Sequence, residues 1–273
     1  MAFLHLLLQG LETTPACLVS VVRTEGSAPR ECGAWMAVFA HQVVGTIGGG
    51  HVEWQAIAEA RRRLGGGGGP PVLRTALGPS LGQCCGGVMH LRFEVLGAED
   101  GDALARRLAP RLAPVALFGG GHVGQALARV LAPLPFQLTW IDSRDGIFPP
   151  DVSQDVACEH SDPVQAAVPG LAPQSCVLIM SFSHAEDLDV LAACLHRQRE
   201  CGDLPFIGLI GSRSKWATFC RRLHERGFTE AELAQVTSPI GVPGIAGKAP
   251  EVIAVAVAAQ LLQTLPPGGA GAR

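Results

Sequence analysis

Gly119-Gly120-Gly121-His122-Val123-Gly124 follows the apolar run Val115–Phe118 and precedes a helical pattern that ends near Leu131. The spacing Gly-x-Gly-x-x-Gly at a strand-to-helix turn is the fingerprint of dinucleotide-binding folds. Its glycines permit a tight turn, the close approach of a phosphate and the packing of helix on strand. A phosphate bound there meets unpaired backbone N–H groups and the positive end of the helix dipole. We therefore predict a strand, a phosphate-binding turn and a helix over residues 115–131.

The residues that follow this fingerprint support the same fold. Asp142 ends the next apolar run, Phe136–Ile141, and stands 23 residues after Gly119. At that distance an acidic residue hydrogen-bonds the ribose in dinucleotide-binding folds. Two further apolar runs, Cys176–Ser181 and Phe206–Ile210, alternate with helical patterns. Strands that alternate with helices in this way predict a doubly wound parallel sheet, as in Rossmann-like domains.

The pentapeptide Gly-Gly-Gly-His-Val of this fingerprint occurs a second time, at Gly48–Val52. This copy follows the apolar run Gln42–Ile47 and also precedes a helical pattern, so it predicts a second anion-binding turn. Glu53 stands where a third glycine would complete the fingerprint. Only the later copy is therefore complete, and two such turns favour a ligand that carries phosphate.

The first part of the chain has its own pattern of strands. Apolar runs predict strands at Cys17–Arg23, Ala34–Phe39, Val72–Leu77 and Val88–Leu96. A proline-containing connection, Pro110–Pro114, marks a boundary. We predict an N-terminal α/β domain over residues 1–112, a Rossmann-like domain over residues 113–265, and a flexible tail over residues 266–273.

Composition excludes several classes of protein. Hydrophobic residues make up 48% of the chain and charged residues 16%, yet no apolar run reaches the ~18 residues that a membrane span requires. A net charge of −3 without long basic runs argues against nucleic acid as a partner. The nine cysteines include no Cys-x-x-Cys pair, and no export signal is recognisable, so reduced thiols in the cytoplasm are expected instead of disulfides or a zinc site.

Gln83-Cys84-Cys85 lies within the glycine-rich segment Gly78–Gly87. Thiols there could coordinate a soft metal, carry a sulfur species or fill space, and the residues alone leave these roles open. The same segment matches the Gly-x-Ser-x-Gly elbow of hydrolases around Ser80. That elbow needs a helix directly after the serine, and the glycines that follow argue against one.

Two further groups have a chemical and a structural interpretation. Arg30 is a candidate clamp for phosphate or carboxylate, because its planar fork donates paired hydrogen bonds; the alternative is an ion pair with Glu31 on a solvated loop. Ser183-His184 suggests acid–base chemistry at a strand end. Neighbouring strand residues point to opposite faces, however, so a structural role is the favoured interpretation.

In chain order, these motifs resemble those of the XdhC family of xanthine dehydrogenase accessory proteins. The similar segments are Gly26–Glu31, Gly45–His51 with Glu53, Leu81–Gly87, Leu117–Gly124, Asp142–Arg144, Gly208–Lys215 and Ser238–Gly241. The resemblance covers almost the whole chain. Two departures are an apparent insertion in Val242–Lys248 and the serine before His184, where the family usually has threonine.

The resemblance implies a chaperone instead of an enzyme. Such a protein binds the molybdenum cofactor (molybdopterin), protects or assists its sulfurated form, and delivers it to apo-xanthine dehydrogenase or a related hydroxylase, with a cysteine desulfurase as the source of sulfur. The resemblance leaves open the client, the mononucleotide or dinucleotide form of the cofactor, and whether the chain forms a homodimer. The alternative function is an NAD(P)-dependent oxidoreductase that uses the complete fingerprint.

On this basis we expect no catalytic residue and thirteen cofactor-binding residues. These are Arg30, Gly48, Gly49, Gly50, Glu53, Gln83, Cys84, Cys85, Gly119, Gly121, His122, Gly124 and Asp142. Cys84 and Cys85 are also the candidate ligands of the molybdenum.

Overall fold

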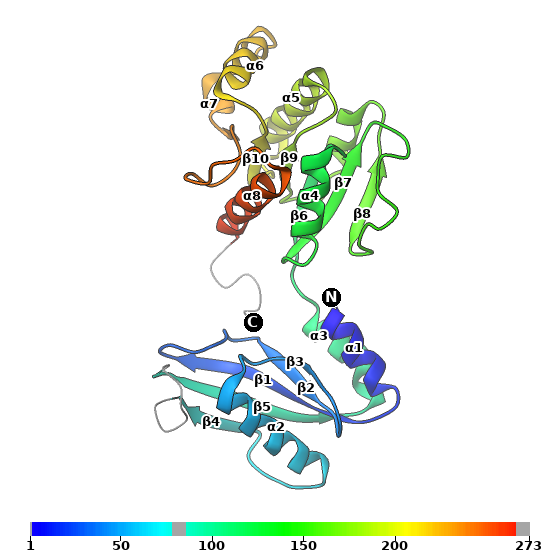
Figure 1. Cartoon of the computed structure of the whole chain (residues 1–273), viewed down its shortest axis with the longest axis vertical. Coiled ribbons are helices and arrows are strands. Elements are labelled where there is room, and N and C mark those ends of the chain that lie inside the picture. Colours follow the sequence, from blue (N-terminus) through cyan, green and yellow to red (C-terminus); the bar gives the residue numbers. More distant parts are fainter. Residues whose placement is uncertain (1, 78–85, 266–273) are drawn as a thin grey trace. The chain divides into compact units, whose positions relative to one another are not determined.

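The computed structural model describes residues 2–77 and 86–265. The chain divides between Arg111 and Leu112 into two compact units. The first unit holds an antiparallel sheet with helices and the second holds a parallel sheet with helices (Figure 1). The predicted fold class, an N-terminal α/β domain followed by a Rossmann-like doubly wound sheet, is confirmed.

A five-stranded antiparallel sheet in the order β3-β2-β1-β5-β4 is the framework of the first unit. Its strands are β1 (Ala16–Glu25), β2 (Trp35–Val38), β3 (Val43–Gly45), β4 (Val72–Ala76) and β5 (Val88–Leu96). The central strand β1 is buried on both faces, and its side chains alternate between two separate cores, as the two-residue period of a strand requires. The sheet must therefore be covered on both sides.

Helices supply both covers. Cys17 and Val19 of β1 belong to the core beneath α2 (Gly50–Leu64), which buries Val52, Ala56 and Ala60. Leu18 belongs to the opposite core, which it shares with residues of α1 (Ala2–Leu11) and α3 (Gly101–Leu108). A short 3₁₀ turn, η2 (Ala98–Asp100), leads into α3.

The second unit contains a six-stranded parallel sheet in the order β11-β10-β9-β6-β7-β8. The strands are β6 (Ala113–Phe118), β7 (Phe136–Asp142), β8 (Val156–His160), β9 (Cys176–Ile179), β10 (Phe206–Leu209) and β11 (Val236–Thr237). The helices are α4 (His122–Leu131), η3 (Val164–Gly170), α5 (His184–Cys201), α6 (Arg213–Glu225), α7 (Glu230–Leu233) and α8 (Pro250–Thr264).

The helices of this unit cover the two faces of its sheet. Val115 and Leu117 of β6 pack into one core with residues of α4 and α8, whereas Ala116 and Phe118 pack into another with residues of α5 and α6. The chain runs from β6 outward through β7 and β8, and then returns to β9 on the other side of β6. In open parallel sheets, ligands bind at the carboxyl ends of the strands where the order reverses in this way.

Two strands of the second unit were not predicted from the sequence, and each has a local reason. In β8 only Val156 is buried, so this edge strand has no apolar run. The strand β11 is two residues long. The helix α5 begins at His184, because the Ser183 hydroxyl accepts a hydrogen bond from the Glu186 N–H at 3.2 Å and caps it.

None of the described helices combines the length and the apolar composition that crossing a membrane requires.

Candidate functional site

The second glycine turn joins β6 to α4, and its three fingerprint glycines play different parts. Gly119 has a φ of 123°, and a Cβ there would collide with the Met180 carbonyl oxygen. A Cβ on Gly124 would collide with the carbonyl oxygen of Gly119. A Cβ on Gly121, by contrast, would meet no described atom within 4 Å. Gly119 and Gly124 therefore hold helix against strand, and Gly121 leaves open space at the start of the helix.

Asp142 lies beside this turn, where the sequence predicted it, but its carboxylate is fully engaged. Oδ2 accepts hydrogen bonds from the Gly120 N–H at 2.5 Å and from Arg144 Nη2 at 2.9 Å. Oδ1 accepts from the backbone N and from Nε of Arg144, both at 2.9 Å. A carboxylate offers about four lone-pair positions. None is left over for the hydroxyls of a ribose.

The ionisation of Asp142 gives a test of these hydrogen bonds to its carboxylate. Burial opposes ionisation, but the hydrogen bonds from Arg144 and Gly120 outweigh it and hold the pKa of Asp142 below its ordinary value. A depressed folded-state pKa adds stability above the unfolded pKa of about 3.9, and that stability is lost as the pH falls further. At pH 7 we expect Asp142→Asn to lower the free energy of unfolding by about 2 kcal/mol.

This difference between wild type and Asp142→Asn should shrink below about pH 4. Urea unfolding of both proteins at pH 7 and at pH 3 measures it. A difference of the same size at both pH values would show that the ionised carboxylate is not what stabilises the turn.

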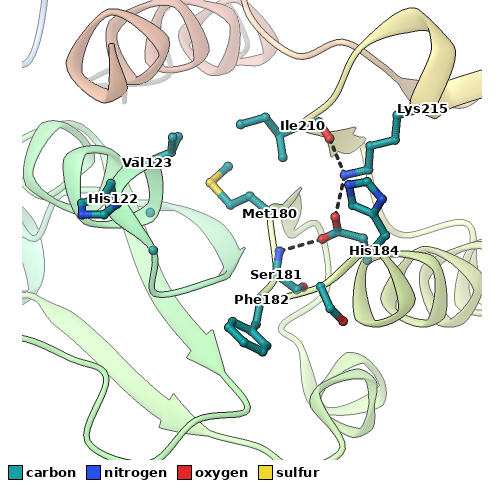
Figure 2. Close-up of a pocket in the computed structure, with 12 residues that line it drawn as sticks. His122, Val123, Met180, Ser181, Phe182, His184, Ile210 and Lys215 are labelled. Atoms are coloured by element: carbon teal, nitrogen blue, oxygen red, sulfur yellow. Dashed lines mark hydrogen bonds and ion pairs between the residues drawn. The ribbon is translucent and has the colours of Figure 1, made fainter. Parts of the chain in front are cut away.

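A pocket of about 400 Å³ opens at the carboxyl ends of β6 and β9 (Figure 2). One wall is the first turn of α4, and the opposite wall is the segment after β9 with residues near the start of α6. The lining residues are Gly121, His122, Val123, Gly124, Met180, Ser181, Phe182, Ser183, His184, Asp187, Ile210 and Lys215. Three predicted site residues, Gly121, His122 and Gly124, are thus brought together at a cavity.

A buried ion pair occupies the wall opposite α4. Lys215 Nζ lies 2.6 Å from Asp187 Oδ2, and the two side chains are 11% and 3% exposed. Lys215 Nζ also donates to the Ile210 carbonyl at 2.9 Å, while Asp187 Oδ1 accepts from the Ser181 N–H at 2.6 Å. An ammonium group has three N–H donors, so one N–H group of Lys215 has no hydrogen-bond acceptor among the described residues.

Sequence reasoning did not select Lys215, Asp187 or Ser181 as site residues. The available signal was positional, since these residues follow the carboxyl ends of β9 and β10, the edge at which parallel sheets bind ligands. What the sequence could not show is that Lys215 and Asp187, 28 residues apart, form a pair.

The first glycine turn joins β3 to α2 as predicted, but an acidic residue of its own fills it. Glu53 Oε2 accepts hydrogen bonds from the N–H groups of Ile47 at 2.9 Å and Gly49 at 3.1 Å, and from the Thr46 hydroxyl at 2.5 Å. Gly48, Gly49 and Gly50 all have positive φ, at 118°, 75° and 68°, which brings these donors around one carboxylate. The N–H groups of Ile47 and Gly49 therefore already have an anionic acceptor.

Three separate segments of the first unit meet around this turn. A Cβ on Gly48 would lie 2.7 Å from Pro29 Cβ and 3.0 Å from Arg30 Cγ. A Cβ on Gly26 would lie 3.3 Å from the Cα of Gly87. The exposed Arg30 thus lies beside the first glycine turn, in a segment that also packs against Gly87. Gln83, Cys84 and Cys85 lie outside the described residues.

The buried thiols of the described residues are poor nucleophiles. Burial raises the pKa of Cys17 to about 11 and the pKa of Cys194 to about 12. Both are therefore protonated at neutral pH, and only a thiolate is a good nucleophile or metal ligand.

Comparison with known proteins finds a matching family model in each of the two units. Residues 115–261 match the model of the XdhC Rossmann domain, and residues 11–75 match the model of the XdhC and CoxI family. A protein of Escherichia coli (strain K12), described as "Uncharacterized protein YqeB", is 30% identical over 265 residues. The match covers 94% of this chain but 45% of that relative, so the chain spans less than half of its length.

A solved structure shows the same fold over almost the whole chain. The crystal structure of a protein from Bacillus halodurans, described as a xanthine dehydrogenase, superposes with a TM-score of 0.77 at 18% sequence identity. The superposition covers 97% of this chain and 96% of that one. At this identity the likeness concerns the fold.

Proposed function

This chain belongs to the XdhC family, and on that premise we propose that it binds the molybdenum cofactor and delivers it to an apo-hydroxylase of the xanthine dehydrogenase type. In this proposal the chain works in the cytoplasm as a carrier, protects or assists the sulfurated form of the cofactor, and receives sulfur by way of a cysteine desulfurase. It does not itself turn over a substrate.

The observation that carries the proposal is the meeting of three segments in the first unit. The segment Gly26–Arg30 contacts Gly48 of the glycine turn on one side and Gly87 on the other. Arg30 is exposed at this place and offers a planar pair of donors for an anionic group. In the sequence, Cys84 and Cys85 directly precede Gly86 and Gly87, so both thiols are within a few residues of the cluster.

The chemistry of this cluster suits the proposed cargo. A sulfurated molybdenum centre is soft, and soft thiolates are its natural protein ligands. An arginine beside the glycine turn supplies the positive charge that a cofactor with an anionic phosphate requires. We propose that Arg30 binds the anionic part of the cofactor and that Cys84 or Cys85 contacts its molybdenum or carries its sulfur.

The alternative, an NAD(P)-dependent oxidoreductase, has less support from the geometry. The acid at the position that hydrogen-bonds ribose in such enzymes is Asp142, and Arg144 and Gly120 take up all of its acceptor positions. Tight binding of NAD with measurable turnover would overturn our proposal.

Arg30→Ala tests the cluster. We expect the variant to fold normally, because the side chain is exposed, and to bind the cofactor at least about tenfold more weakly, the cost of a hydrogen bond to a charged group. The purified chain is incubated with molybdenum cofactor, and bound metal and pterin are then quantified. Arg106→Ala, an exposed arginine of α3 on the opposite side of the sheet, is the matched control. Equal loading of the two variants would exclude Arg30 from the site.

The double variant Cys84→Ala/Cys85→Ala tests the thiols. Small polarizable side chains in a glycine-rich segment contribute modestly to stability, so folding should be preserved. We expect less retained molybdenum cofactor and fewer active sulfurated centres in the client enzyme. Cys158→Ala/Cys201→Ala, which removes two exposed thiols of the second unit, is the control. A Cys84/Cys85 variant that loads and activates the client at the wild-type rate would make these thiols structural.

A further inference from the structure

We propose that the pocket of the second unit binds an organic phosphate monoester and excludes dinucleotides. This inference goes beyond the proposed function, because it assigns a ligand class to the Rossmann unit whether or not the first unit carries the molybdenum cofactor. The inference rests on the proposed function at one point alone, which is the identification of the natural ligand as molybdopterin, itself a phosphate monoester.

The pocket presents donors of hydrogen bonds from both of its walls. The first N–H groups of α4 have no partner within the helix, and among the described residues no side chain caps this helix at Gly121. The helices α5 and α6 are each capped by a serine hydroxyl. Gly121 leaves the approach to α4 open, since a Cβ there would meet no described atom within 4 Å. A phosphate fits this place in both charge and space.

Two more donors lie on the opposite wall. Lys215 Nζ uses two of its three N–H groups, on Asp187 and on the Ile210 carbonyl. The Ser181 hydroxyl is buried and has no hydrogen-bond partner among the described residues. A buried polar group without a partner calls for an explanation, and an absent ligand is one. Rotation about the Cα–Cβ bond of Ser181 can turn its hydroxyl toward a ligand in the pocket.

The carboxylate that lines the pocket, in contrast, is already used. Both oxygens of Asp187 accept hydrogen bonds, from Ser181 and from Lys215. Since Asp187 and Lys215 neutralise each other, the pocket carries no net negative charge that would repel an anion. A pocket with these donors and no free carboxylate among its described lining residues favours an anionic ligand over a neutral, hydroxyl-rich one.

The half of the crevice that holds adenosine in dinucleotide-binding folds is bridged by side-chain contacts. Arg144, which follows β7, lies 4.5 Å above the ring of Phe182, which follows β9. Beside this contact, Ser143 Oγ donates to Glu186 Oε1 at 2.7 Å. Both contacts join the segments that follow β7 and β9. They lie next to Asp142, whose acceptor positions are already taken by Arg144 and Gly120. The ribose and base of an adenosine would have to displace them.

The open half of the crevice lies toward β10. Met180, Ile210 and Val123 give it apolar surface, and His184 lies beside them (Figure 2). A ligand with one phosphate at the α4 turn and a flat or apolar organic group against these side chains fits the available space. A second nucleotide half does not.

The test is calorimetric titration of the full chain with phenyl phosphate, inorganic phosphate and NAD⁺. We expect saturable binding of phenyl phosphate, weaker competing binding of inorganic phosphate, and no binding of NAD⁺ at the same concentrations. Ser181→Ala should weaken phenyl phosphate binding about tenfold, the effect of losing a hydrogen bond to a charged group. It removes a hydroxyl that has no partner, so the fold is not at risk.

Ser238→Ala is the matched control, since Ser238 carries a second buried hydroxyl that has no partner among the described residues, and it does not line the pocket. The double variant Asp187→Asn/Lys215→Gln removes the ion pair as a whole and should also abolish binding. NAD⁺ binding as tight as that of phenyl phosphate, or equal binding by the Ser181→Ala and Ser238→Ala variants, would overturn the inference. Failure of cofactor loading with intact phenyl phosphate binding would instead refute the proposed function alone.

Discussion

Gly124→Val is expected to destabilise the second unit by about 4 kcal/mol or more, enough to unfold it in a marginally stable chain. Gly124 sits in the first turn of α4, and any Cβ there collides with the carbonyl oxygen of Gly119. That oxygen cannot move freely, because it accepts a hydrogen bond from Nε1 of the buried Trp140 at 2.9 Å. The helix would have to leave its strand, and the core that it shares with α8 would open.

Gly121→Val is the control for this prediction. A Cβ at Gly121 meets no described atom within 4 Å, and its φ of −71° suits any residue. We expect this variant to lose about 1 kcal/mol of stability at most, because valine is a poorer N-cap residue than glycine. It should also lose phosphate binding, because the new side chain fills the space beside the N–H groups of α4. Near-UV circular dichroism and urea unfolding of both variants measure the contrast. Equal stability of the two would show that the turn relaxes easily and that the fingerprint does not fix the packing of α4.

The fold of the second unit was predictable because its signals are local. A glycine fingerprint, an apolar strand and a helical pattern are all contained within residues 115–131. The edge strand β8 was missed because a strand with one buried residue leaves no apolar run to detect. The opening helix α1 was missed too, although Leu7 and Leu11 pack into the core that α1 shares with α3.

The roles of the site residues were less predictable than their places. The spacing correctly put Asp142 at the glycine turn, but its engagement depends on how Arg144 folds back onto it. Glu53 was expected to bind cofactor, and the structure places its carboxylate inside the turn. Both outcomes depend on the count of hydrogen-bond partners, which sequence spacing does not contain.

Glu53→Ala should reveal what that carboxylate does. Three donors, the N–H groups of Ile47 and Gly49 and the Thr46 hydroxyl, converge on a single oxygen of Glu53. Removal of the acceptor leaves them without a protein partner, so we expect the free energy of unfolding of the first unit to fall by about 3 kcal/mol. Glu53→Gln, which keeps an oxygen but not the charge, should lose about half as much. The exposed Glu12→Ala is the control.

Inorganic phosphate separates a structural carboxylate from one that guards a binding site. Without the Glu53 side chain, the glycine turn presents open N–H groups at the start of α2, the arrangement that binds anions at helix N-termini. Phosphate bound at this turn should then stabilise the first unit of Glu53→Ala in proportion to its occupancy and leave the first unit of wild type unchanged, since the pocket proposed to bind phosphate belongs to the second unit. If phosphate stabilises the first unit of neither protein, the turn is built for Glu53 alone. If it stabilises both equally, the anion binds elsewhere, and the carboxylate of Glu53 does not substitute for a phosphate.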